Sequence, residues 1–183
     1  MVGFRKLWDR QGAQARTSAR ALYADLATAA LNAPLYEQGA ARDTFEGRAA
    51  MITANATLVM WRLKRIDTPL ARKIAERLNG LVLDGFDAAY RELGVGDSSI
   101  ARKVRKLAEI HYGLGKALTE ALNMPQSDRI GSVTDCVKRN AVSQDSKASL
   151  LAAYLLHNAG RFEAVEDDDV LAGKLAWTLP GAD

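Results

Sequence analysis

Apolar residues recur at every third or fourth position along most of this chain, which is the spacing of one face of an α-helix. The pattern predicts long helices over residues 17–32, 44–66, 68–93 and 98–122, and shorter ones over 129–140 and 145–157. No segment alternates apolar and polar residues with the period of two that a half-buried strand shows. The pattern therefore predicts an all-α protein, a single-domain bundle of six or seven helices.

Capping residues set the predicted helix boundaries. Asp43 or Thr44 can cap the second helix, and Thr68 followed by Pro69 is a favourable start for the third. Gly80 lies inside that third helix, where a glycine costs about 1 kcal/mol relative to alanine. We expect one helix that bends near Gly80, with two helices separated there as the alternative. The shorter helices are expected to turn these residues inward: Ile130, Val133, Val137, Leu150, Leu151, Tyr154 and Leu155.

A strongly basic helix follows a glycine corner at residues 94–96. The glycines allow the positive φ that a sharp helix exit needs, and Asp97, Ser98 or Ser99 can cap the next helix. Four cations lie near the beginning of this helix: Arg102, Lys103, Arg105 and Lys106. Cations are unfavourable at a helix N-terminus. We therefore interpret this basic face as a contact for a client, for phosphate groups of lipid or RNA, or for an acidic partner. An ordinary solvated helix face is the alternative.

The helix over residues 44–66 is apolar well beyond a single stripe. Met51, Leu58, Met60 and Trp61 widen its apolar surface. Such a helix is either central in a bundle or lines a groove. Because methionine adapts to varied apolar partners, these four residues are candidates to line a groove that accepts an apolar client helix, with the protein core as the alternative.

The two ends of the chain carry opposite charge. The basic segment 1–16 has two interpretations of equal weight: an amphipathic segment that binds an anionic membrane surface, or a frayed terminus. In the first interpretation the candidate membrane contacts are Phe4, Arg5, Lys6, Leu7 and Trp8. The segment lacks a secretory apolar region, and we expect an intact bacterial N-terminus rather than a transit peptide. After the helical domain, residues 17–160, comes an acidic and then apolar tail, residues 161–183. Its acidic stretch 163–169 either covers the basic helix or is disordered.

Composition and motifs argue against catalysis. The chain has 183 residues, a net charge of +3, one cysteine and two histidines. Neither zinc-ligand spacing, nor a phosphate-binding loop, nor a nucleophile elbow is present in the sequence. We expect Cys136 to be a small semi-buried side chain and His111 to make a structural hydrogen bond. No apolar run reaches the length of about eighteen residues that a membrane-spanning helix needs. The prediction is a non-enzymatic protein without cofactor, metal, DNA or small-molecule substrate.

Two sequence blocks carry a resemblance to a known family. The first runs from the glycine corner into the basic helix: Gly94, Val95, Gly96, Asp97, Ser99, Val104, Lys106, Leu107, Ala108, Glu109, Tyr112 and Gly113. The second lies upstream: Asp43, Thr44, Gly47, Arg48 and Met51. Together they resemble the ubiquinol–cytochrome c chaperones, assembly factors of respiratory complex III in mitochondria and alphaproteobacteria.

This resemblance implies a non-catalytic assembly chaperone. Such a protein would bind newly made cytochrome b, or another complex III subunit, until haem and partner subunits arrive. In a bacterium the resemblance implies a cytoplasmic protein, peripheral at the inner membrane, and in a eukaryote one on the matrix side. The anionic membrane surface and the ribosome are further candidate partners. An RNA- or ribosome-binding module without chaperone activity is the alternative.

Overall fold

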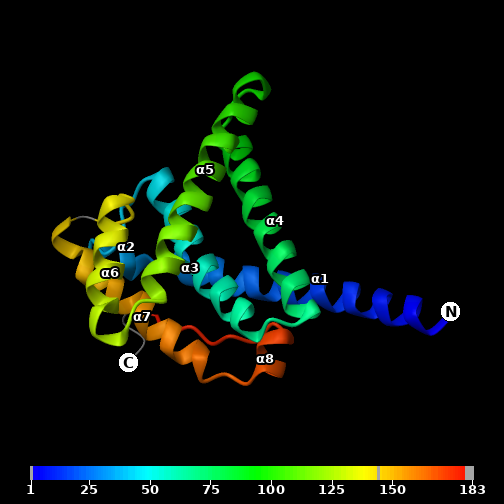
Figure 1. The fold of residues 1–183 in the computed structure, drawn as a ribbon. Helices are drawn as coiled ribbons and strands as arrows, with labels where there is room; N and C mark the ends of the chain where they lie inside the picture. Colours follow the sequence, from blue (N-terminus) through cyan, green and yellow to red (C-terminus); the bar gives the residue numbers. More distant parts are fainter. Residues whose placement is uncertain (1, 144, 180–183) are drawn as a thin grey trace.

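All secondary structure that is described in this protein is helical. The computed structural model describes the backbone of residues 2–143 and 145–179, and their side chains except those of 2–9, 97 and 98. The elements are α1 (Val2–Ala30), α2 (Ala33–Glu37), α3 (Phe45–Ile66), α4 (Pro69–Glu92), α5 (Asp97–Leu122), α6 (Gln126–Arg139), a 3₁₀ turn (Asp145–Lys147), α7 (Ala148–Glu163) and α8 (Asp167–Leu171) (Figure 1). The helices form one bundle, which confirms the predicted all-α class.

Helix α3 is the centre of the bundle. It packs against α1, α4, α5 and α7, and every residue from 53 to 59 is buried. Its wide apolar surface is therefore explained by neighbours on several sides. The predicted caps are confirmed: the Thr44 hydroxyl accepts a hydrogen bond from the Gly47 amide (3.0 Å), and Thr68 accepts one from Ala71 (3.1 Å).

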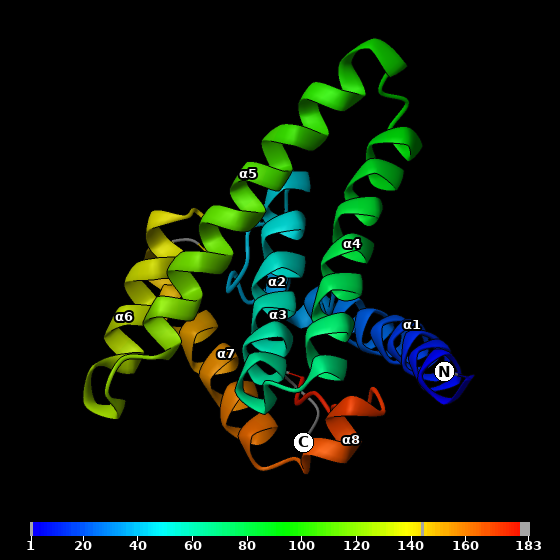
Figure 2. The ribbon, with the colours of Figure 1, turned by 45° about the vertical axis from the view of Figure 1, so that its right-hand side comes forward.

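Helices α4 and α5 form a hairpin that projects from the bundle (Figure 2). Helix α4 is continuous from Pro69 to Glu92, so the alternative of two helices separated at Gly80 is wrong. At the turn Gly94 takes a φ of 71°, and Gly96 is the N-cap of α5 without a side-chain cap. The Ser99 hydroxyl donates to the Gly96 carbonyl (3.1 Å) and so does not cap the helix. The side chains of the other two candidate caps, Asp97 and Ser98, are not among those that the structure describes.

Two other features differ from the sequence expectation. Helix α1 begins at Val2 rather than Thr17, so the backbone of the basic N-terminal segment continues the helix. Ile130 and Leu150 were expected to point inward, yet they are 47% and 41% exposed. Helix α6 packs on α5 and α7, and α7 packs on α3 and α6, which leaves the outer edges of both helices in water.

The acidic stretch near the C-terminus docks on α3. Arg62, only 7% exposed, donates to the carbonyl oxygens of Phe162 (2.7 Å) and Val165 (2.6 Å) and to the Asp167 carboxylate (2.6 Å). Helix α8 consequently lies at the end of the molecule opposite the hairpin tip (Figure 1). Both expected arrangements, a cover over the basic helix and a disordered tail, are wrong for the described residues, because the buried guanidinium needs these acceptors.

Candidate functional site

The basic face lies on the hairpin arm formed by α5. The side chains of Arg102, Lys103, Arg105 and Lys106 are all exposed. None of them forms an ion pair with another described residue. Lys103 Nζ lies 5.5 Å from the centroid of the Tyr90 ring, a cation–π arrangement. The basic face is thus available to a charged partner, and such a contact stays a prediction.

Apolar side chains line a groove of about 530 Å³ between α1, α3 and α4, the apolar groove. The lining residues are Tyr23, Ala27, Leu31, Phe45, Arg48, Ala49, Ile52, Gly85, Phe86, Ala89, Glu92 and Leu93. Leu31 is 43% exposed and Leu93 is 62% exposed. Exposed apolar side chains beside an apolar groove are typical of an interaction surface.

Tyr90 joins the apolar groove to the basic face. The centroid of its ring lies 4.6 Å from the ring centroid of Phe45, which lines the groove. The ammonium group of Lys103 lies over the same tyrosine ring. Tyr90, itself only 8% exposed, thus links Phe45 in the lining of the apolar groove to one residue of the basic face, Lys103.

The four predicted groove residues divide between the core and a different groove. Met51 and Leu58 are completely buried, because α3 is covered by its neighbours, so the expectation that they line an open groove is wrong. Met60 and Trp61 do line a groove, but not the apolar one. The sequence analysis missed Ile52 and the other apolar-groove residues. Their helical spacing is visible in the sequence, but which faces the neighbouring helices leave open depends on tertiary packing.

A second groove of about 530 Å³, the polar groove, lies between α3, α4 and α5. Its lining residues are Thr57, Met60, Trp61, Lys64, Asn79, His111, Tyr112, Gly115, Lys116, Thr119, Glu120 and Asn123. His111 is 2% exposed and contacts Thr53 Oγ1 through Nδ1 (3.1 Å) and Asn79 Oδ1 through Nε2 (3.0 Å). Burial lowers the pKa of His111 to about 4. The predicted structural hydrogen bond of His111 is confirmed.

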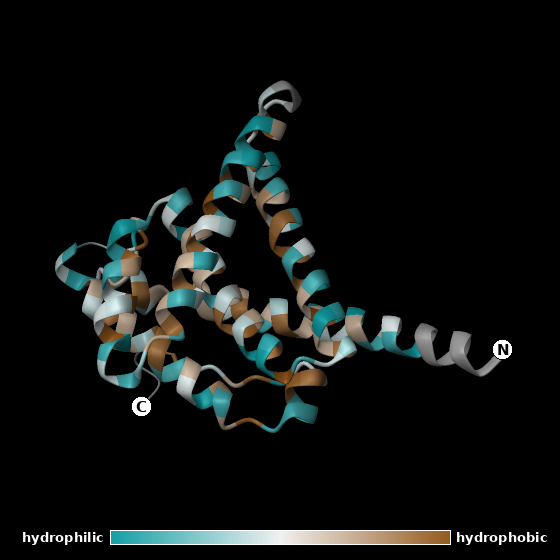
Figure 3. Ribbon diagram, in the orientation of Figure 1, coloured by the Kyte–Doolittle hydropathy of each residue, from teal (hydrophilic) through white to brown (hydrophobic). Residues whose placement is uncertain are grey.

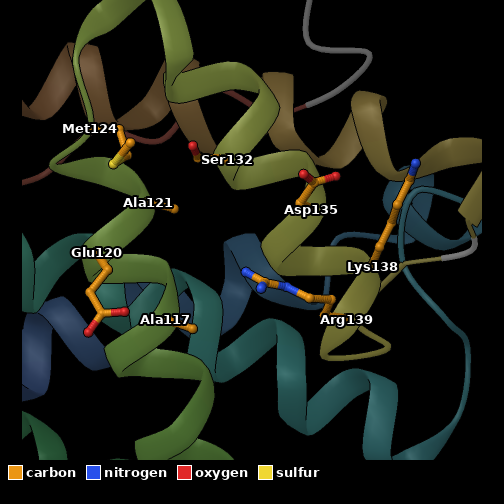
Figure 4. Close-up of a pocket in the computed structure, with 8 residues that line it drawn as sticks. All are labelled: Ala117, Glu120, Ala121, Met124, Ser132, Asp135, Lys138 and Arg139. Carbon is orange, nitrogen blue, oxygen red and sulfur yellow. The ribbon is translucent and has the colours of Figure 1, made fainter.

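A third groove, of about 460 Å³, separates α5 from α6 (Figure 4). Ala117, Glu120 and Ala121 line it from α5, Met124 lines it from the turn after α5, and Ser132, Asp135, Lys138 and Arg139 line it from α6. Its charge is balanced, because the lining contains two acids, Glu120 and Asp135, and two bases, Lys138 and Arg139. The hydropathy colouring shows the mixed polarity of this part of the bundle (Figure 3). Balanced charge and an open lining do not favour a particular ligand.

Other candidate chemistry has no support among the described residues. No group of three histidine, cysteine, aspartate or glutamate side chains there can hold a metal ion. Cys136 was expected to be semi-buried but is completely buried, and burial raises the pKa of its thiol. None of the described helices is long and apolar enough to cross a membrane. The candidate membrane contacts at residues 4–8 lie outside the described side chains, so that contact remains a prediction.

Comparisons with known proteins agree with the fold and with the signature blocks. A family profile, Ubiquinol-cytochrome C chaperone, matches residues 37–177, well over half of the chain. A crystal structure of the Cbp3 homolog from Brucella abortus has the same fold, with a TM-score of 0.79 over 96% of each chain at 24% sequence identity. A comparison with curated proteins found no match. The chain belongs to the ubiquinol–cytochrome c chaperone family of complex III assembly factors.

Proposed function

We propose that this assembly chaperone binds newly made cytochrome b through the apolar groove and the basic face together. The observation that carries the proposal is the position of Tyr90, whose ring packs on Phe45 of the apolar groove and lies beneath the ammonium group of Lys103 of the basic face. Each membrane-spanning segment of the client is followed by a polar loop. The apolar side chains of the segment can enter the apolar groove while acidic side chains of the loop pair with the cations of the basic face.

The size of the apolar groove limits what it holds. A membrane-spanning helix about 30 Å long and about 10 Å wide occupies roughly 2,400 Å³. The groove offers about 530 Å³. We therefore propose that it holds a few large side chains from one face of the client, each contributing about 1.5–3 kcal/mol when fully buried. A binding free energy made of a few such contributions allows the client to dissociate again, which a chaperone requires.

The basic face suits a position at the anionic inner surface of the membrane, where the client is inserted. A lysine or arginine close to such a surface contributes about 1 kcal/mol, so the four cations together would contribute about 4 kcal/mol. Attachment of this kind is peripheral and weakens as salt increases.

Charge substitutions at the mouth of the apolar groove test the client site. Leu31→Asp with Leu93→Asp places two carboxylates where the client side chains would enter, and both positions are exposed, so folding is retained. Ile130→Asp with Leu150→Asp is the matched control, because these residues are similarly exposed elsewhere. Co-purification of newly made cytochrome b should fall about tenfold or more for the first pair only. Equal recovery with both pairs would exclude the apolar groove.

Replacing Arg102, Lys103, Arg105 and Lys106 by alanine tests the basic face. We expect weaker binding to anionic vesicles and lower recovery of cytochrome b. If both stay at the wild-type level, the basic face is solvated surface. If only ribosomal RNA binding is lost, with a steep salt dependence, the protein acts as an RNA-binding module.

A further inference from the structure

None of the described residues lines both the polar groove and the apolar groove. It opens between α3, α4 and α5, while the apolar groove opens between α1, α3 and α4. A ligand in the polar groove therefore leaves the proposed client site open. Whatever binds there would be a second partner of the same chaperone.

A directed chain of hydrogen bonds ends at the mouth of the polar groove. Asn79 Nδ2 donates to the Tyr112 hydroxyl oxygen (3.1 Å), so Asn79 Oδ1 accepts from His111 Nε2. The neutral His111 ring then accepts from the Thr53 hydroxyl at Nδ1. Because the Tyr112 oxygen already accepts, its own hydrogen is left to donate outward. Tyr112 lines the groove and is 55% exposed, so this donor is accessible to a ligand.

Two ammonium groups from different helices line the same groove. Lys64 comes from α3 and Lys116 from α5, and both are exposed. Neither forms an ion pair with any residue that the structure describes, and Glu120, one turn beyond Lys116, is unpaired as well. With His111 neutral, two lysines and one glutamate leave a net charge of +1 on the lining, which favours an anionic ligand.

We propose that the polar groove binds an acidic peptide segment of a partner protein. Carboxylates of the segment would accept hydrogen bonds from Lys64, Lys116 and Tyr112, and an apolar side chain between them would contact Met60. Among the described lining residues there is no arginine, so the planar fork that favours phosphate is missing from this part of the groove. An open groove between two helices also accommodates an extended segment better than it encloses a small ion.

Fluorescence anisotropy with a fluorescein-labelled peptide of alternating glutamate and leucine tests this site. The same peptide with glutamine in place of glutamate is the probe control. Lys64→Glu with Lys116→Glu should weaken binding about tenfold or more, since each reversal replaces an attraction by a repulsion. Lys138→Glu with Arg139→Glu makes the same charge change in the groove between α5 and α6 and should leave the affinity within about twofold. Tyr112→Phe, which removes only the hydroxyl, should weaken binding about fivefold.

Three results would overturn the proposal. The first is equal binding of the glutamate and glutamine peptides by the wild-type chain. The second is an equal loss in both charge-reversed variants, which would indicate a general charge effect. The third is a loss of binding to phosphatidylglycerol vesicles in the Lys64/Lys116 variant while peptide binding is kept, which would assign the groove to lipid. None of these measurements involves cytochrome b, so they succeed or fail independently of the proposed client site.

Discussion

Lowering the pH should destabilise this protein through His111. The neutral ring accepts a hydrogen bond from Thr53 and donates one to Asn79, and only 2% of the residue is exposed. A proton on Nδ1 would replace the acceptor by a donor and create a charge in a site with little water. The folded state therefore takes up the proton only near pH 4, whereas the unfolded chain takes it up near 6.5. Between these values the unfolded state binds more protons, so the free energy of unfolding falls as the pH falls.

The magnitude follows from the two pKa values. A lowering from 6.5 to about 4 corresponds to roughly 3 kcal/mol, at about 1.36 kcal/mol for each pKa unit. The contribution is fully present above pH 6.5 and fully lost below pH 4. At about pH 4.5 the expected loss relative to neutral pH is roughly 2 kcal/mol, a substantial part of the stability of an ordinary domain.

Urea unfolding at neutral pH and at about pH 4.5 measures this loss. His111→Gln cannot take up the proton, so its stability should fall by about 2 kcal/mol less than that of the wild type between the two pH values. His157→Gln is the control, because His157 is exposed on α7 and its variant should follow the wild type. Parallel losses in the wild type and His111→Gln would refute the assignment of acid sensitivity to His111.

Two further predictions concern packing and the C-terminal segment. A Cβ at Gly47 would collide with the backbone carbonyl group of Arg42, whereas one at Gly113 meets open space. Gly47→Ala should therefore destabilise by about 1–3 kcal/mol and Gly113→Ala should stabilise by up to about 1 kcal/mol, as thermal unfolding will show; equal effects would contradict the packing at Gly47. Arg62→Met removes three hydrogen bonds that hold the segment around Asp167, so stability should fall by about 2–3 kcal/mol and proteolysis should begin near that segment. Unchanged proteolysis would mean that the segment is held by other contacts.

The fold class could be predicted because it depends on local patterns. Thr44, Thr68 and Pro69 identify helix starts by side-chain chemistry that acts within one turn, and the structure agrees. The glycine corner likewise places the hairpin turn, where Gly94 has positive φ. These features need no knowledge of distant parts of the chain.

The candidate surfaces could be predicted only in part. The exposure of the four cations of the basic face could be predicted, because charged side chains are rarely buried. The burial of Met51 and the docking of Asp167 on Arg62 depend on contacts across the fold, 105 residues apart in the second case. The apolar groove arises where three helices diverge, which helical periodicity does not reveal.

Site-specific photo-crosslinking during synthesis of cytochrome b tests the central claim most directly. A photoreactive amino acid at position 93 stands at the mouth of the apolar groove, and one at position 130 stands on an exposed surface elsewhere. The account predicts a crosslink to newly made cytochrome b from position 93 that is absent from position 130. Crosslinking from position 130 alone, or from neither position in cells that assemble complex III, would contradict it.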